Sequence, residues 1–141
     1  MIVNKLKRKT VQLAEKHEEM RRELEFFLQE LPHVSRLPRD VAAVLEFIHA
    51  HLFESSLNVN TVKHGCRIKN NNISTRFRIG LGLGIREYIE TLRLYAALRL
   101  LQDRRFEIYL IAVAVGYEHQ ETFCRAFRRQ FGYPPSGHIE S

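Results

Sequence analysis

The chain is 141 residues long and 45% hydrophobic, which is enough for one domain, or a domain with an arm, and which excludes a disordered tail. Its 22 Lys and Arg against 16 Asp and Glu give a net charge of +6, which suits nucleic acid first and an anionic membrane surface second. No apolar run approaches the ~18 residues of a membrane span, and the first residues lack the apolar stretch of a signal peptide.

Residues 1–36 are predicted to form an arm that consists of a long amphipathic helix and a break. Apolar side chains recur in it at seven-residue steps, at Leu6, Leu13, Met20 and Phe27. A weaker second series consists of Val3, Leu24 and Leu31. Such a seam is typical of a dimerising coiled coil, but also of a helix that packs on its own domain, and both interpretations stay open. The candidates for a dimer contact are Leu13, Met20, Leu24, Phe27 and Leu31. The segment LPHVSRLPRD, with its two prolines, is the predicted boundary of the arm.

The body, residues 39–141, is predicted to be helical throughout. DVAAVLEFIHAHLF carries one apolar stripe, with Asp40 as its N-cap. IREYIETLRLYAALRLLQD predicts the longest helix of the body, over about residues 85–102. On that helix we expect the arginines to face outward: Arg86, Arg93 and Arg99. Because no strand-like alternation of useful length occurs, the predicted fold class is all-α.

The second half of the body repeats the first at an offset of about fifty residues. The matching positions are Val59, Val62, Ile68, Ile73, Phe77 and Gly82 in the first copy, and Ile108, Ile111, Tyr117, Phe123, Phe127 and Gly132 in the second. Each copy predicts a short helix, a tight turn and a second helix with an apolar pair four residues apart. This is the pattern of a helix-turn-helix, placed at about residues 57–82 and 107–132.

The second helix of each copy has a polar face opposite its apolar pair. Gln, Asn and Arg can form paired hydrogen bonds with base edges in a major groove, while Thr and outer Arg suit phosphates. The candidates for base contact are Asn71, Thr75, Gln120, Glu121 and Arg125. The candidates for phosphate contact are Asn72, Arg78, Thr122, Arg128 and Arg129. For single residues a structural explanation stays open: Glu121 and Arg125 could form an exposed ion pair, and residues 70–72 could be a helix N-cap.

The segment IYLIAVAVGYEHQETFCRAFRRQFGYPPSGH closely resembles the C-terminal signature of AraC/XylS-type transcription regulators. That signature is I-x-x-I-A-x-x-V-G-F, then an aromatic-x-R-x-F, then F-G and a proline. It is met here by Ile108, Ile111, Ala112, Val115, Gly116, Tyr117, Phe123, Arg125, Phe127, Phe131, Gly132 and Pro135. The resemblance extends over about residues 40–139. It implies two helix-turn-helix units joined by the long helix, each inserting a helix into successive major-groove segments ~34 Å apart.

The first unit departs from the family pattern at its turn. Arg67 stands where the family tends to have a glycine, as Gly116 provides in the second unit. An arginine in a left-handed turn position costs roughly 1–2 kcal/mol, so we expect this turn to be rebuilt or loose. The glycines of GLGLG, residues 80–84, suggest a flexible junction before the long helix.

The sequence therefore predicts a sequence-specific DNA-binding transcription regulator. The alternative is an interaction module that sequesters another regulator through its N-terminal helix and binds DNA weakly. The predicted partners are double-stranded DNA and, through residues 1–36, a second copy or RNA polymerase. The arm is too short for the effector-binding β-barrel that many family members carry, so no small-molecule effector is expected in this chain. The arm could equally be the trailing helix of a sensor domain from a longer regulator.

The cysteines and histidines predict no metal, cofactor or disulfide. Cys66 and Cys124 lie far apart and form no CxxC pair, so neither a zinc site nor a disulfide framework is indicated. His49 and His51 are two residues apart, which places them on different helix faces. DNA-repair alkyltransferases that carry a module of this type need a reactive cysteine in a separate catalytic domain, and neither cysteine here has an obvious His or Glu partner, so we expect no enzyme. The expected compartment is a reducing one, the cytoplasm.

Overall fold

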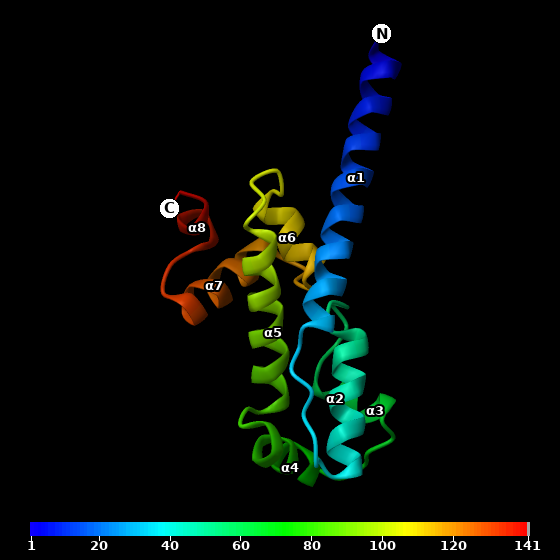
Figure 1. Ribbon diagram of the computed structural model, residues 1–141, viewed down its shortest axis with the longest axis vertical. Coiled ribbons are helices and arrows are strands. Elements are labelled where there is room, and N and C mark those ends of the chain that lie inside the picture. The colour runs from blue at the N-terminus through cyan, green and yellow to red at the C-terminus, as the bar shows by residue number, and fades with distance from the viewer. Residues whose placement is uncertain (141) are drawn as a thin grey trace.

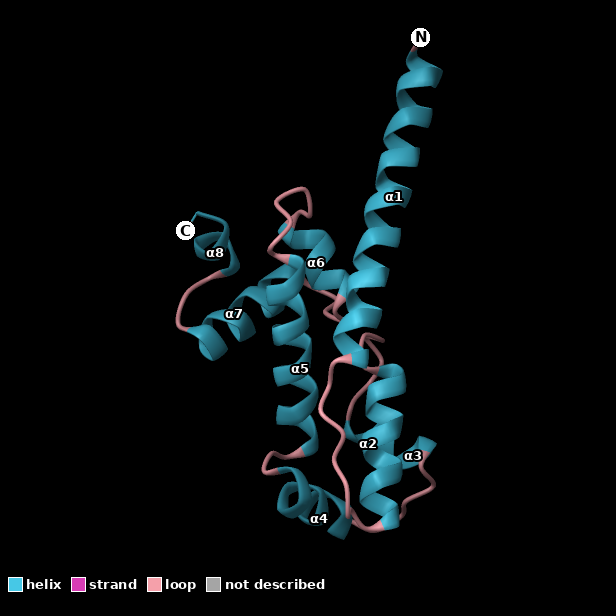
Figure 2. Ribbon diagram, in the orientation of Figure 1, coloured by secondary structure: helices cyan, strands magenta, loops and turns pink. Residues whose placement is uncertain are grey.

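The computed structural model describes the backbone of residues 1–140 and the side chains of residues 1–137, and all regular structure in that range is helical (Figures 1 and 2). This confirms the predicted all-α class. Residue 141, the last of the predicted body, lies outside the described residues. The helices are α1 (Ile2–Gln29), α2 (Arg39–His51), α3 (Val59–Gly65), α4 (Asn72–Leu81), α5 (Ile85–Leu100), α6 (Ile108–Ala114), α7 (Gln120–Phe131) and α8 (Pro135–Glu140).

Two hydrophobic cores lie along α5, one toward each of its ends. The first core joins α2, α3 and α4 to the beginning of α5, where Ile85 and Ile89 are buried. The second joins α6 and α7 to the end of α5, where Leu94 and Leu100 are fully buried. Each core thus belongs to one helix-turn-helix pair, α3–α4 or α6–α7, and α5 is the link between the two units (Figure 1).

The second half of α1 packs on the second core, while its first half projects beyond the body (Figure 1). Met20 and Leu24 are 2% and 7% exposed within that core. Phe27 and Leu31 are half-buried, whereas Leu13 is 44% exposed. From Met20 onward the heptad seam therefore belongs to the packing of the helix on its own domain. The division of the chain into an arm of residues 1–36 and a body from residue 39 stays a prediction.

Ion pairs also hold α1 to the region around the end of α5. The guanidinium of Arg99 binds the carboxylates of Glu23 at 2.8 Å and Glu30 at 2.7 Å. Arg105, in the turn between α5 and α6, pairs with Glu19. Because the apolar contacts and these ion pairs lie on the second half of α1, this half is fixed to the second unit.

Two details of the sequence-based helix assignments are wrong. Asp40 is not the N-cap of α2: Pro38 stands there, and the Asp40 carboxylate accepts from the backbone N–H of Val41 and pairs with Arg76 at 2.9 Å. Arg93 does not face outward, since its exposed fraction is 8%. Its guanidinium donates to backbone carbonyls inside the protein. A helical projection of one segment cannot show such partners, because they belong to another part of the chain.

The turn between α3 and α4 is not rebuilt, contrary to one of the two expectations. Arg67 occupies the left-handed conformation with φ of 57°, as Gly116 does in the second unit with φ of 105°. The backbone N–H of Ile68 donates to the carbonyl of Lys63 at 2.9 Å, and that of Tyr117 donates to Ala112 at 2.9 Å. The two turns thus have the same pattern of backbone hydrogen bonds, and the first unit accommodates the backbone strain at Arg67.

The glycines after α4 occupy defined places in the chain. Gly82 closes α4 in the left-handed conformation, with φ of 83°, as Gly132 closes α7 with φ of 84°. The N–H of each donates at 2.8 Å to an arginine carbonyl of the preceding turn. Gly84 then stands as the N-cap of α5 and is buried. A single turn therefore connects α4, which ends at Gly82, to α5, which begins after Gly84.

Candidate nucleic-acid interface

Helices α4 and α7 each expose a polar face because a buried pair of apolar residues, four positions apart, holds the opposite face in a core. Ile73 and Phe77 of α4 are 1% and 0% exposed, and Phe123 and Phe127 of α7 are both 0% exposed. All the residues predicted to contact DNA are exposed: Asn71, Asn72, Thr75, Arg78, Gln120, Glu121, Thr122, Arg125, Arg128 and Arg129. The structure thus gathers these side chains on two helices, one in each unit.

At the start of α4 the asparagines are already engaged by the chain itself. The Nζ of Lys63 donates to the Oδ1 of Asn71 at 2.6 Å, so this amide oxygen is occupied in the free protein. The Oδ1 of Asn70 accepts from the backbone N–H of Asn72 at 3.2 Å. Asn71 stands at the N-cap position but forms no side-chain cap bond. The backbone at the start of α4 is therefore capped by Asn70, while the amide oxygen of Asn71 is held by Lys63.

Two of the predicted phosphate contacts are paired with carboxylates of the linking helix α5. Arg78 of α4 lies 3.4 Å from Glu87, and Arg129 of α7 lies 2.7 Å from Glu90. These pairs are solvent-exposed, so each contributes little to stability and can exchange for another anion. Neither carboxylate was among the residues predicted from the sequence to lie at the interface, because α5 was expected only to link the two units.

Arg125 and Arg128 on α7 are differently placed. Neither forms a hydrogen bond or an ion pair with any residue that the structure describes, and both are exposed. In particular, Arg125 and Glu121 do not form the ion pair that their four-residue spacing allows. Both guanidinium groups are consequently available to an external acceptor.

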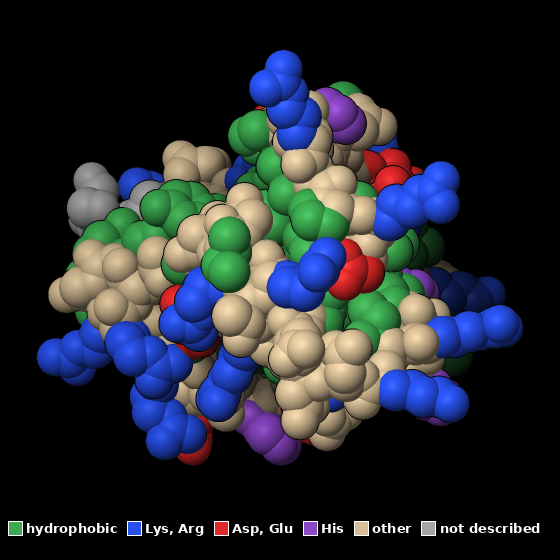
Figure 3. Space-filling view, turned by 90° about the horizontal axis from the view of Figure 1, so that it is seen from below, with side chains coloured by type: hydrophobic (Ala, Val, Ile, Leu, Met, Phe, Trp, Pro, Cys, Tyr) green, Lys and Arg blue, Asp and Glu red, His purple; other side chains and the backbone are tan. Residues whose placement is uncertain are grey.

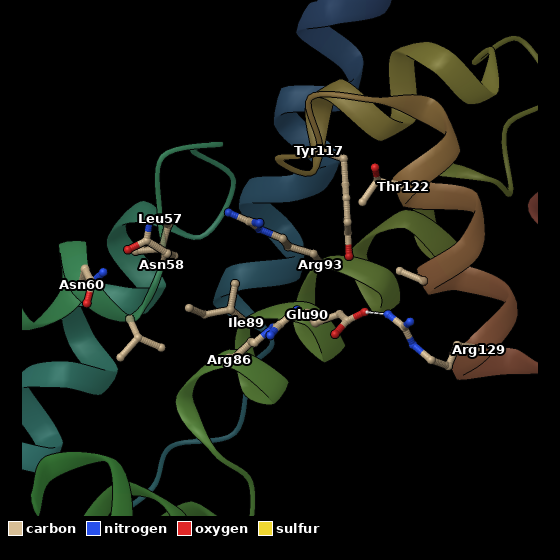
Figure 4. Close-up of a pocket in the computed structure, with 12 residues that line it drawn as sticks. Leu57, Asn58, Asn60, Arg86, Ile89, Glu90, Arg93, Tyr117, Thr122 and Arg129 are labelled. Carbon is tan, nitrogen blue, oxygen red and sulfur yellow. Dashed lines mark hydrogen bonds and ion pairs between the residues drawn. The ribbon is translucent and has the colours of Figure 1, made fainter. Parts of the chain in front are cut away.

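A groove of about 450 Å³ lies between the two units, along the face of α5 (Figure 4). Asn58 and Asn60 of the first unit line one side, and Thr122 and Arg129 of α7 line the other. The Arg129 side chain reaches across to Glu90 on the floor of the groove (Figure 4). Asn58 and Asn60 were absent from the sequence-based candidates, because contacts with DNA were sought only on the second helix of each copy.

Asn58 has a structural role at the start of α3. Its side chain accepts from the backbone N–H of Thr61 at 2.9 Å, and the Thr61 hydroxyl accepts from the backbone N–H of Asn58 at 2.8 Å. This reciprocal capping box fixes the beginning of α3. The spacing of Asn58 and Thr61 is the sequence signal that could have located this helix start.

Positive charge surrounds the end of the molecule that carries α4. In the view from below, Lys and Arg side chains project from much of the rim, most densely at the lower left, on the side where α7 lies in Figure 1 (Figure 3). Burial lowers the pKa of Arg93, which lies inward of this surface, and raises the pKa of Tyr117 beside it to about 12. The exposed arginines of both helices present charge on the surface, Arg76 and Arg78 from α4 and Arg125, Arg128 and Arg129 from α7, whereas Arg93 is buried.

No helix in the described part of the chain is long and apolar enough to cross a membrane. Among the described side chains, no cluster of three or more His, Cys, Asp or Glu could hold a metal ion. Cys66 and Cys124 are both free and half-buried, and burial raises the pKa of each thiol.

The chain is similar to several bacterial regulators in sequence. Residues 67–140 match a family model described as a helix-turn-helix domain. The regulatory protein SoxS of Salmonella typhimurium is 31% identical over 96 residues, which cover 68% of this chain and 89% of SoxS. The Msm operon regulatory protein of Streptococcus mutans is 31% identical over 96 residues, 68% of this chain and 34% of that protein. The chain thus spans about a third of the length of several curated relatives.

The fold also matches a solved structure. The C-terminal domain of AraT, a response regulator from Geobacillus stearothermophilus, superposes with a TM-score of 0.71 at 26% identity. The match covers 75% of this chain and 88% of that domain. The sequence comparison and the fold comparison therefore agree, because both match this chain to bacterial regulators.

Proposed function

The chain belongs to the AraC/XylS family of helix-turn-helix transcription regulators, and on that premise we propose that it is a sequence-specific DNA-binding regulator. In this proposal α4 and α7 enter two successive major-groove segments on one face of the DNA. The observation that carries it is the pair of exposed polar faces, each held outward by residues buried in its own core. Such a regulator acts on the chromosome, in the cytoplasm expected from the sequence.

The relatives weigh against the other functions considered from the sequence. SoxS and the Msm operon protein are named as regulatory proteins, which are not enzymes. A module that only sequesters another regulator is not favoured either, because the polar faces of α4 and α7 serve no purpose in it. The exposed side chains of both helices are consistent with contact to DNA.

Within α7, Arg125 is the proposed base reader and Arg128 the proposed phosphate contact. Both guanidinium groups are free of intramolecular partners among the described residues, so neither must break an ion pair before it binds. A guanidinium can bind the O6 and N7 atoms of guanine with two hydrogen bonds. Gln120 and Glu121 in the first turn of the same helix would complete the base contacts.

Within α4, Thr75 and Asn71 are the proposed base readers, with Asn72 and Arg78 toward phosphates. The hydrogen bond from Lys63 to Asn71 must open, or Lys63 must follow Asn71 to the DNA and bind a phosphate there. Arg78 must likewise leave Glu87. Two contacts of α4 must leave a partner, whereas on α7 only Arg129 must leave Glu90, so α4 would contribute less net affinity than α7.

The test compares two arginines on the same helix. Arg125→Ala should cost about 1–3 kcal/mol on the specific site and relax the preference at one base position. Arg128→Ala should weaken binding to every sequence alike. Arg104→Ala, in the exposed turn between α5 and α6, controls for the loss of one positive charge. The measurement is titration of specific and unrelated DNA at one fixed salt concentration, with a site selected from genomic fragments. If Arg125→Ala and Arg128→Ala weakened both kinds of DNA equally, the division of roles would be wrong.

The projecting half of α1 is the proposed contact for a protein partner, a second copy first and RNA polymerase second. Met20 and Leu24 are covered by the body, so the surface consists of the more N-terminal seam residues. Leu6 and Leu13 are 59% and 44% exposed there. Sedimentation equilibrium of the chain and of Leu13→Glu tests the pairing: a concentration-dependent mass that the substitution abolishes would support it. A monomer at all concentrations would leave a polymerase contact to be measured directly.

A further inference from the structure

Arg93 of α5 is the one charged side chain that is buried among the residues whose side chains are described. Its Nε donates to the backbone carbonyl of Leu52 at 2.8 Å, and its Nη2 donates to the carbonyl of Glu54 at 2.7 Å. These carbonyls lie at the end of α2 and in the turn that follows it, in the first unit. A buried charge is costly unless it is well hydrogen-bonded, so the guanidinium is fixed to this position.

The same guanidinium touches the turn of the second unit. A Cβ at Gly116 would lie 2.9 Å from the Cζ of Arg93, closer than real Cβ contacts allow. The Cζ also lies 5.9 Å from the centre of the Tyr117 ring. Figure 4 shows the Arg93 side chain between Leu57 and Asn58 on one side and Tyr117 on the other. One side chain on the shared helix therefore contacts both units.

The two turns differ in a way that Arg93 explains. Arg67 and Gly116 occupy equivalent positions, and both have positive φ. Because Arg67 is tolerated there with the same backbone hydrogen bonds, positive φ alone does not demand glycine at position 116. The additional demand is space, since the guanidinium of Arg93 lies against Gly116, whereas the side chain of Arg67 is exposed.

Few other contacts fix the angle between the units. No helix of the first unit packs extensively on a helix of the second within the described residues, and α5 is common to both. Phe27 and Phe53 pack against both cores, with ring centroids 6.5 Å apart. Apolar contacts of this kind hold surfaces together but are not directional. The hydrogen bonds of Arg93 are directional, so they can set an orientation.

We propose that Arg93 is a positioning residue that sets the distance and angle between α4 and α7. It does so from within the protein and touches no DNA itself. Where DNA is concerned, the inference rests on the proposed reading of two segments. It then follows that Arg93 determines how strictly the protein requires one spacing between those segments.

The first test needs no DNA. With both native cysteines changed to Ser, spin labels at Ser74→Cys on α4 and Gln130→Cys on α7 report the distance between the helices; both positions are exposed. We expect a narrow distance distribution in this parent, a distribution at least about twice as broad in Arg93→Met, and partial recovery in Arg93→Lys. Arg86→Met, an exposed arginine on the same helix, is the matched control and should leave the distribution unchanged. An unchanged distribution in a folded Arg93→Met protein would overturn the inference.

The second test uses DNA that carries both segments with one base pair added between them. One base pair rotates the second segment by about 34° around the DNA axis, so the parent should lose about tenfold or more in affinity. Arg93→Met should lose about threefold or less for the same insertion, while its affinity for DNA with a single segment stays at the parent value. Equal insertion penalties in parent and variant would overturn the role in spacing. A parent that ignores the insertion would instead overturn the two-segment function, and the distance measurement would still decide whether Arg93 positions the helices.

Discussion

Replacing Gly116 by Ala should destabilise the protein much more than replacing Gly132, although both glycines have positive φ. At Gly132 an added Cβ meets nothing within 4 Å, so only the strained backbone counts, about 1 kcal/mol after the gain from a stiffer unfolded chain. At Gly116 the methyl group also displaces the guanidinium of Arg93. Losing one of its two hydrogen bonds adds about 1.5–3 kcal/mol, because the donor is charged. The total for Gly116→Ala is therefore about 2.5–4 kcal/mol.

Urea denaturation followed by circular dichroism measures these differences, and a third variant isolates their cause. In an Arg93→Met background the guanidinium is absent, so Gly116→Ala should destabilise the protein only by about as much as Gly132→Ala. The excess of about 1.5–3 kcal/mol would then appear as a coupling energy between positions 93 and 116. Equal losses for Gly116→Ala and Gly132→Ala in the unmodified background would refute the steric argument.

Met20→Ala should lower the free energy of unfolding by about 2–4 kcal/mol, since Met20 is buried in the second core, whereas Leu6→Ala should change it by less than about 0.5 kcal/mol; urea denaturation compares them. Glu90→Gln should strengthen binding to DNA of any sequence, because it releases Arg129 for a phosphate. About one more counterion should then be released on binding, which titrations at several salt concentrations measure as a steeper fall of log affinity with log salt. Burial lowers the pKa of His49 below 6.5, so the unfolded chain takes up its proton first as the pH falls. Stability should therefore be complete above pH 6.5 and decline below it, and His49→Gln should flatten that decline in denaturation midpoints measured against pH.

Each of these outcomes has a clear opposite. Equal losses for Met20→Ala and Leu6→Ala would contradict the packing of α1 on the second core. An unchanged salt dependence in Glu90→Gln would mean that Arg129 does not reach phosphate. If His49→Gln kept the full decline below pH 6.5, another group would be responsible for it.

The helices and their turns could be predicted because their signals are local. The buried pairs Ile73–Phe77 and Phe123–Phe127 recur at helical spacing, and Gly82 and Gly132 end their helices in the left-handed conformation that glycine favours. The polar faces of α4 and α7 followed directly from these pairs. Once the inward residues are known, the helical period determines which side chains remain exposed.

The errors arose where a distant part of the chain decides the outcome. Arg93 carries a charge and was placed outside, but its partners are backbone carbonyls 39 and 41 residues away. Arg67 was expected to disturb its turn, yet the backbone hydrogen bonds of the turn hold it in place. The pairing of Arg129 with Glu90 depends on how α7 lies on α5. None of these contacts leaves a pattern in its own segment of sequence.

The heptad seam of α1 illustrates the same limit. Met20 and Leu24 have the spacing that either a second copy or the chain's own body requires. What distinguishes the two is the matching surface on α5 and α6, which is assembled only in the folded chain. In the second half of α1 the sequence pattern identified the buried face, but it could not identify what covers it.

The position of α1 also bears on how the chain assembles during synthesis. α1 leaves the ribosome before α5 and α6, and the ion pairs that join it to the body span 69 to 86 residues of sequence. At ~5–20 residues per second, α1 waits about 4–16 s for its binding surface, while α2, α3 and α4 can already gather their own core. During this interval Met20 and Leu24 are uncovered on the nascent chain. α1 is thus translated before the surface on which it docks, and its apolar face is open to chaperones until the second unit has been made.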